Sequence, residues 1–206
     1  IIKKKGEIKL ISKIYTILAK IKLYSLGVKI GKNFICEGPL KLNKIDSQKF
    51  NLVIGDNVYF FGYIDIKIRS DATIIISDGT KIDKGVRIIA ANGATIYFGK
   101  NNKLMFYSMV NAGADITTGD FTGISAYSFI TSSMHEKKEG TPYMLQGWKH
   151  SEIIIGSDVQ IGSHCHIVSG SKIGDGATIS PLSFVFKEVD PNTTVSGNPA
   201  RLLVRK

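Results

Sequence analysis

Residues 153–185 read IIIGSDVQIGSHCHIVSGSKIGDGATISPLSFV, and every sixth position from Ile155 onward is aliphatic. This spacing matches neither the helical period of about 3.6 residues nor the period of about 2 of a simple strand. It is typical of a parallel β-helix, in which each hexad supplies a short strand and a corner, and three hexads make a coil. The interior would then be filled by the repeated aliphatic positions, which are Ile155, Ile161, Ile167, Ile173, Ile179 and Val185.

A looser form of the repeat extends upstream, with coil markers at residues 31, 55, 77, 99, 119, 156 and 174. The intervals between them are 24, 22, 22, 20, 37 and 18 residues. The interval of 37 equals one coil of 18 plus about 19 further residues, more than the ~12–15 residues that a structureless loop usually reaches. The sequence therefore predicts a loop at 136–150 that is extruded from an otherwise regular β-helix.

The chain is expected to contain an N-terminal amphipathic helix (1–27), a β-helix domain (28–200) that carries the loop, and a C-terminal tail (201–206). In the segment 6–25 a polar stripe follows the i, i+3/i+4, i+7 spacing of a helix, and most other positions are apolar. Two interpretations remain open. The helix caps the β-helix or packs on a neighbouring subunit, or it is a basic interfacial helix that keeps the protein near lipid-linked substrates.

The charge of the chain points to anionic partners. Lys and Arg number 27 against 17 Asp and Glu, which gives a net charge of +10. Because much of this excess lies in the first 50 residues, we expect no nucleic-acid groove. The two cysteines, Cys36 and Cys165, fit a reducing compartment better than a disulfide scaffold. No apolar run approaches the ~20 residues of a membrane span, so we expect a cytoplasmic protein with at most peripheral membrane contact through the helix.

His135 is the candidate catalytic residue. When the hexads are continued into the break, Ile130 and Met134 point inward and His135 becomes the last, outward residue of its hexad, where the loop departs. A hydroxyl group must lose its proton when it attacks an acyl carbon, and an imidazole with a pKa of about 6.5 can accept that proton near neutral pH. The pattern therefore favours a general base at His135.

The hexads, the histidine before an extruded loop and the ending "KEVDPNTTVSGNPARLL" together resemble the left-handed β-helix acetyltransferases, in particular the sugar and polysaccharide O-acetyltransferases. The resemblance implies a left-handed β-helix, a homotrimer, acetyl-CoA bound between neighbouring prisms, and His135 as the base. It also places the cofactor against the segment 160–163 and the pair at 180–181, with basic contacts to phosphate. The implied cofactor-binding residues are Gln160, Ser163, Ser180, Pro181, Lys187 and Arg201.

The chain departs from this family pattern both in the cofactor segment and at the acceptor site. Many relatives have Trp at the position of Gln160, and an Asn that positions the acceptor aligns with Met105. We therefore take Tyr107, Asn111 and Trp148 as candidate acceptor-binding residues. His150, at the return of the loop, either lines the acceptor pocket or serves in packing. Spacing does not select between Asp115 and Glu136 as the residue that orients His135.

Several alternatives follow from the other reactive side chains. His164 and His166 are two residues apart, as in a metal site, but the three-histidine spacing of the related carbonic anhydrases is absent and no metal is expected. Cys165 falls at an inward position and is expected in the core. The predicted function is acetyl transfer from acetyl-CoA to a sugar hydroxyl, in a surface polysaccharide or its precursor. The alternatives are acetylation of an amino sugar or an antibiotic on the same scaffold, and a non-catalytic assembly scaffold.

Overall fold

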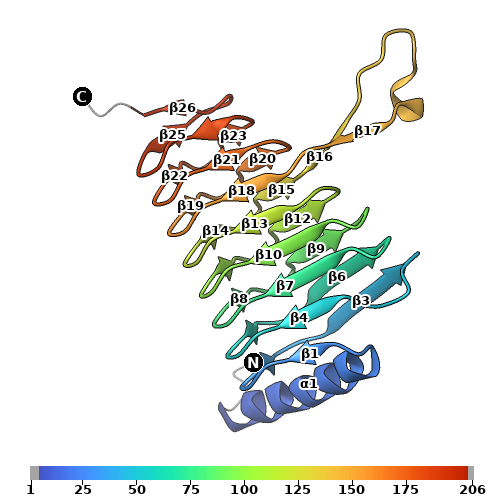
Figure 1. The fold of residues 1–206 in the computed structure, drawn as a ribbon. Coiled ribbons are helices and arrows are strands. Elements are labelled where there is room, and N and C mark those ends of the chain that lie inside the picture. The colour runs from blue at the N-terminus through green and yellow to red at the C-terminus, as the bar shows by residue number, and fades with distance from the viewer. Residues whose placement is uncertain (1–4, 204–206) are drawn as a thin grey trace.

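The computed structural model describes residues 5–203, with side chains from residue 10 onward. It is a parallel β-helix of about seven turns in which each coil adds one strand to each of three sheets (Figure 1). A single helix, α1 (Lys5–Ser25), lies across the N-terminal end. The predicted fold class, a left-handed parallel β-helix with an N-terminal helix and an extruded loop, is confirmed.

Three sheets form the faces of the β-helix, and neighbouring strands within each sheet come from successive coils. Sheet A consists of β1 (Lys29–Ile30), β4 (Leu52–Ile54), β7 (Thr73–Ile76), β10 (Thr95–Phe98), β13 (Ile116–Thr118), β18 (Ile153–Ile155), β21 (Lys172–Ile173) and β24 (Glu188–Val189). Sheet B consists of β2 (Ile35–Cys36), β5 (Tyr59–Phe60), β8 (Lys81–Ile82), β11 (Lys103–Leu104), β14 (Gly123–Ile124), β19 (Gln160–Ile161), β22 (Thr178–Ile179), β25 (Thr194–Ser196) and β26 (Arg201–Leu202). Sheet C consists of β3 (Leu40–Ile45), β6 (Ile64–Arg69), β9 (Arg87–Ala90), β12 (Met109–Ala112), β15 (Phe129–Thr131), β20 (His166–Val168) and β23 (Phe184–Val185).

The aliphatic position of each hexad forms the core. Ile161 pairs with Ile124 in the coil before it and with Ile179 in the coil after it, and all three side chains are buried. Such columns run the length of the stack, so each coil covers the apolar surface of its neighbour. Cys165 is buried at the inward corner position, as the hexad phase predicts.

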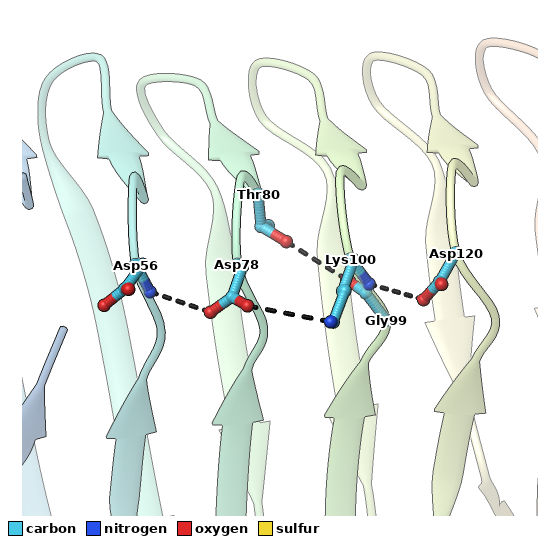
Figure 2. Close-up of polar contacts among 6 residues, drawn as sticks. All are labelled: Asp56, Asp78, Thr80, Gly99, Lys100 and Asp120. Atoms are coloured by element: carbon cyan, nitrogen blue, oxygen red, sulfur yellow. Dashed lines mark hydrogen bonds and ion pairs between the residues drawn. The ribbon is translucent and has the colours of Figure 1, made fainter. Parts of the chain in front are cut away.

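Corners between sheets A and B are held by a column of aspartates (Figure 2). Asp78 Oδ1 accepts the backbone N–H of Asp56 at 2.8 Å, and Asp120 Oδ1 accepts that of Lys100 at 2.7 Å. Where the column has Lys100 instead of an acid, its Nζ reaches back to Asp78 Oδ2 at 3.9 Å. The side-chain oxygens therefore satisfy corner N–H groups that the β ladders leave unpaired.

Helix α1 closes the open end of the core. Thr16 Oγ1 donates to the carbonyl of Cys36 at 3.1 Å and accepts the N–H of the same residue at 3.0 Å. Ala19 and Leu23 are buried against the first coil. No helix within residues 5–203 is both long and apolar enough to cross a bilayer.

The extruded segment is a β-hairpin. Strands β16 (Ser133–His135) and β17 (Trp148–His150) pair antiparallel, and the 3-10 helix η1 (Tyr143–Leu145) lies in the connection between them (Figure 1). The chain thus leaves the stack at Ser133, three residues before the predicted loop start. At the other end, Arg201 and Leu202 pair antiparallel with β25, so the predicted tail begins as part of sheet B.

Candidate active site

His135 lies on the hairpin and not on a coil. It is the last residue of β16 and faces Trp148 of β17, with ring centroids 3.6 Å apart. The ring of Tyr143 lies on it as well, at 4.2 Å. The prediction that Met134 points inward is wrong: Met134 is 47% exposed, because the chain has already left the hexad repeat there. His135 is therefore positioned by aromatic neighbours within the hairpin.

The imidazole of His135 is half-buried, and its Nδ1 is buried with no hydrogen-bond partner among the described residues. Neither of the two acids suggested for this role hydrogen-bonds to this nitrogen. Asp115 Oδ1 accepts the backbone N–H of Thr95 at 2.7 Å. Glu136 is exposed, and its backbone N–H donates to the carbonyl of Gly147. An unpaired buried polar atom costs about 1–3 kcal/mol, so Nδ1 is a position at which a partner would be stabilising.

The base of the hairpin is fixed by Ser132, which is fully buried. Its Oγ accepts the N–H groups of Gly113 and Ala114, both at 3.0 Å, and donates to the carbonyl of Ala114 at 2.7 Å. These three bonds tie the point of departure to the coil beneath. Sequence reasoning missed this serine, although its place directly before the break in the repeat was a usable signal.

His150 ends the hairpin in a second polar contact. Its Nδ1 is 2.9 Å from Ser133 Oγ and its Nε2 is 3.2 Å from Asn92 Nδ2. Gly113 lies beneath: a Cβ there would be 2.4 Å from His150 Nδ1 and 2.3 Å from Ser133 Oγ. Of the two roles considered for His150, these contacts support packing, because both ring nitrogens are taken up in holding the hairpin to the coils.

The predicted cofactor residues fall into two groups in the last coils. Lys187 and Arg201 line one hollow of about 310 Å³, which Glu188 and Asp190 also line. The second group lies on sheet B and at the corners that lead to sheet C, and it contains Gln160, Ser163, Ser180 and Pro181. At these corners the coils approach closely, since a Cβ on Gly162 would lie 2.6 Å from the Pro181 nitrogen.

The three candidate acceptor residues are not gathered in one place within the chain. Trp148 contacts His135, and Asn111 lies beneath the hairpin, where its carbonyl accepts the N–H of Ser132 at 3.1 Å. Tyr107 instead sits at the corner before β12, at the opposite end of the sheet C strands, where it stacks on Tyr127 with ring centroids 5.5 Å apart.

The remaining candidate side chains have structural environments. His164 stacks on Tyr127 at a corner, whereas His166 lies on sheet C between Phe129 and Phe184. Burial lowers the pKa of the His166 imidazole. No group of three or more His, Cys, Asp or Glu side chains suited to a metal occurs in the part of the chain that the structure describes. Burial also raises the pKa of the Cys165 thiol, which opposes a nucleophilic role.

Residues 152–187 match the family model described as bacterial transferase hexapeptide (six repeats). A chloramphenicol acetyltransferase of Klebsiella aerogenes is 30% identical over 157 residues, which cover 76% of this chain and 68% of the relative. WbbJ of Escherichia coli, a putative lipopolysaccharide biosynthesis O-acetyl transferase, is 25% identical over 144 residues, covering 66% and 74%. YvoF of Bacillus subtilis, a putative acetyltransferase, is 32% identical over 103 residues, or 50% of this chain and about half (52%) of the relative.

Solved structures share the fold. The polysialic acid O-acetyltransferase OatWY matches with a TM-score of 0.64 at 16% identity, over 85% of this chain and 87% of that chain. A mutant of AntD, an N-acyltransferase from Bacillus cereus in complex with dTDP and coenzyme A, matches with a TM-score of 0.59 at 18% identity, over 90% and 87%. These structures show the fold. The family model and the Klebsiella aerogenes relative confirm the predicted family: the chain belongs to the bacterial hexapeptide-repeat acetyltransferases.

Proposed function

We propose that the protein transfers acetyl from acetyl-CoA to a sugar hydroxyl, with His135 as the general base. The observation that carries the proposal is the placement of His135 on the extruded hairpin, held between Tyr143 and Trp148 and outside the aliphatic core. A histidine that only filled the core would lie among the hexad side chains. Membership of an acetyltransferase family supports acetyl as the transferred group, and similarity to WbbJ supports a glycan as the acceptor.

In the proposed step, Nε2 of His135 accepts the hydroxyl proton as the oxygen attacks the thioester carbonyl carbon. The new C–O bond forms, the C–S bond breaks, and the proton passes from the imidazole to the departing CoA thiolate. Nδ1 would then carry the second ring hydrogen, which is buried and has no acceptor among the described residues.

For acetyl-CoA, we propose that the hollow lined by Lys187 and Arg201 receives phosphate groups, because both cations line it. Gln160, Ser163, Ser180 and Pro181 would flank the pantetheine arm along sheet B and its corners. Both groups lie in the coils that follow the hairpin, so a cofactor bound along them would run toward the coil from which the hairpin departs.

Two acceptor classes have specific support. The hairpin exposes Lys137, Lys138 and Lys149 against Glu136 and Glu139, and this positive excess favours an acidic glycan. The second candidate is the hydroxyl of an antibiotic, because the Klebsiella aerogenes relative that is 30% identical is a chloramphenicol acetyltransferase. Both acceptors would use the same base and the same cofactor residues.

The test is release of CoA thiol from acetyl-CoA in the presence of an acidic polysaccharide, a neutral polysaccharide, chloramphenicol or a nucleotide-linked amino sugar. We expect release with the acidic polysaccharide and its loss in His135→Asn. Release with chloramphenicol alone would select the second candidate, and release with the amino sugar alone would indicate N-acetylation. If acetyl-CoA fails to bind in calorimetry, the proposal is wrong and the non-catalytic scaffold is favoured.

A further inference from the structure

The N-terminal helix packs on the first coil in an orientation that leaves its apolar face exposed to solvent. Its inward side consists of the partly buried Thr16 and the buried Ala19 and Leu23, of which only Leu23 is a large aliphatic residue. The opposite side is a row of large aliphatic residues that are each 48–61% exposed. These are Leu10, Ile14, Ile17, Leu18 and Ile21.

The spacing of this row is that of one helix face. Leu10, Ile14, Ile17 and Ile21 follow the i, i+4, i+7, i+11 pattern, so they form a continuous ridge along α1. Scattered exposed aliphatic residues are ordinary on a protein surface, but a contiguous apolar ridge marks an interaction site. Helix α1 lies across the end of the β-helix (Figure 1). The ridge residues are exposed on the side opposite the buried Ala19 and Leu23, so the ridge faces away from the stack.

Almost all of the net charge of the chain lies in the first 50 residues of the sequence. Residues 1–50 contain twelve lysines, no arginine and three acidic residues, a net charge of +9, which leaves +1 for residues 51–206. Lys13 is exposed beside the ridge. A hollow of about 690 Å³ adjoins the C-terminal end of α1, and Lys29, Lys44 and Lys49 line it.

We propose that this end docks onto the surface of an anionic phospholipid bilayer. The ridge on α1 would enter the boundary between headgroups and acyl chains, and the lysines would pair with lipid phosphates. The alternative partner for the ridge is a second copy of this chain, and the positive charge favours the bilayer over it. Two copies joined through α1 would bring two lysine-rich surfaces together, whereas an anionic membrane neutralises one.

This placement has a consequence for the acceptor, which rests on the proposed function. The coil that precedes the hairpin is four steps along sheet A from the first coil, since β13 follows β1, β4, β7 and β10. At about 4.8 Å per step, the hairpin base stands roughly 20 Å from the docked end. An acceptor attached to lipid would therefore need several sugar units between its anchor and the acetylated hydroxyl.

The experiment is co-sedimentation of the full chain with vesicles of phosphatidylcholine alone or mixed with phosphatidylglycerol. We expect binding to the mixed vesicles only, and weaker binding when salt is raised to about 0.5 M. Ile14→Gln/Ile21→Gln should weaken binding by roughly tenfold or more. Its matched control, Tyr97→Gln/Phe121→Gln, replaces exposed apolar residues far from α1 and should bind as the unmodified protein does.

A second pair of variants tests the charge. Lys44→Gln/Lys49→Gln should reduce binding, whereas Lys81→Gln/Lys103→Gln, exposed lysines of sheet B, should not. Thermal unfolding followed by circular dichroism verifies that each variant is folded. Equal binding to neutral vesicles, no binding, or no effect of the α1 variant would overturn the proposal, as would a change in oligomeric state in that variant. Acetyl transfer is not measured, so failure of membrane binding is distinct from failure of the proposed function.

Discussion

His135 and Trp148 face each other across the two strands of the hairpin, with ring centroids 3.6 Å apart. The proposed base is thus held by a neighbour that lies thirteen positions further along the chain, on the returning strand. Its position depends on the pairing of β16 with β17 and on the contacts that fix the hairpin to the coils, and not on the hexad core.

Removing the Trp148 ring should misplace the base. In Trp148→Leu the imidazole loses its contact across the hairpin, and we expect the turnover rate to fall by at least about tenfold, because small displacements of a catalytic group are costly. The affinity for acetyl-CoA should be unchanged. Met144→Leu is the control, since Met144 is in the same hairpin and 83% exposed. Equal losses in both variants would contradict a positioning role for Trp148.

Gly113 should be required for the anchoring of the hairpin. A Cβ at this position would meet Ser133 Oγ at 2.3 Å and His150 Nδ1 at 2.4 Å, so in Gly113→Ala both side chains must move and their contact at the hairpin base is disturbed. We expect the turnover rate to fall while the unfolding temperature changes little. Gly123→Ala, whose Cβ would meet nothing within 4 Å, should leave the unfolding temperature unchanged. Full activity in Gly113→Ala would show that the hairpin position does not matter.

The aspartate column should contribute to stability through its hydrogen bonds more than through its ion pair. Asp78→Ala removes the acceptor of the Asp56 N–H at 2.8 Å, and we expect a loss of about 1–2 kcal/mol in the free energy of unfolding. Lys100→Ala removes only the exposed 3.9 Å pair and should cost less than about 0.5 kcal/mol. Denaturant titrations of both variants measure the difference, and the reverse order would refute this ranking.

His166 should make the protein less stable in acid. Burial lowers its pKa in the folded state, so the unfolded chain binds more protons as the pH falls through the ordinary value of 6.5. The contribution of the neutral His166 ring to the free energy of unfolding is therefore complete above pH 6.5, and it is lost as the pH falls toward the folded-state pKa. His166→Phe, between Phe129 and Phe184, should raise the unfolding temperature more at about pH 5 than at about pH 8. An equal change at both values would contradict this origin.

The hexad period made the fold and the family predictable, because each aliphatic position such as Ile161 repeats a single structural role in every coil. The same period wrongly predicted that Met134 and His135 lie on a coil, whereas both lie on the hairpin. Phasing assumes that the chain remains on the coil, but Ser132 already turns it into an antiparallel pairing that a six-residue repeat does not encode.

The surroundings of the base could not be predicted for a related reason. Contacts such as those of His150 with Ser133 and Asn92 join residues that are 17 and 58 positions apart, and no local spacing signals them. The orientation of α1 was equally hidden. Its amphipathic pattern predicted a helix, yet only the packing of Thr16 against Cys36 places the polar side inward.

The most direct test of the proposed function compares the unmodified protein with His135→Asn in two assays, acetyl transfer to the acceptor found in the panel and acetyl-CoA binding by calorimetry. If His135 is the base, the turnover rate falls by roughly 10²-fold or more while the dissociation constant for acetyl-CoA is unchanged. His150→Asn, which loosens the hairpin but leaves the proposed base in place, should lose less. A His135→Asn protein that turns over within a few-fold of the unmodified rate would contradict the assignment.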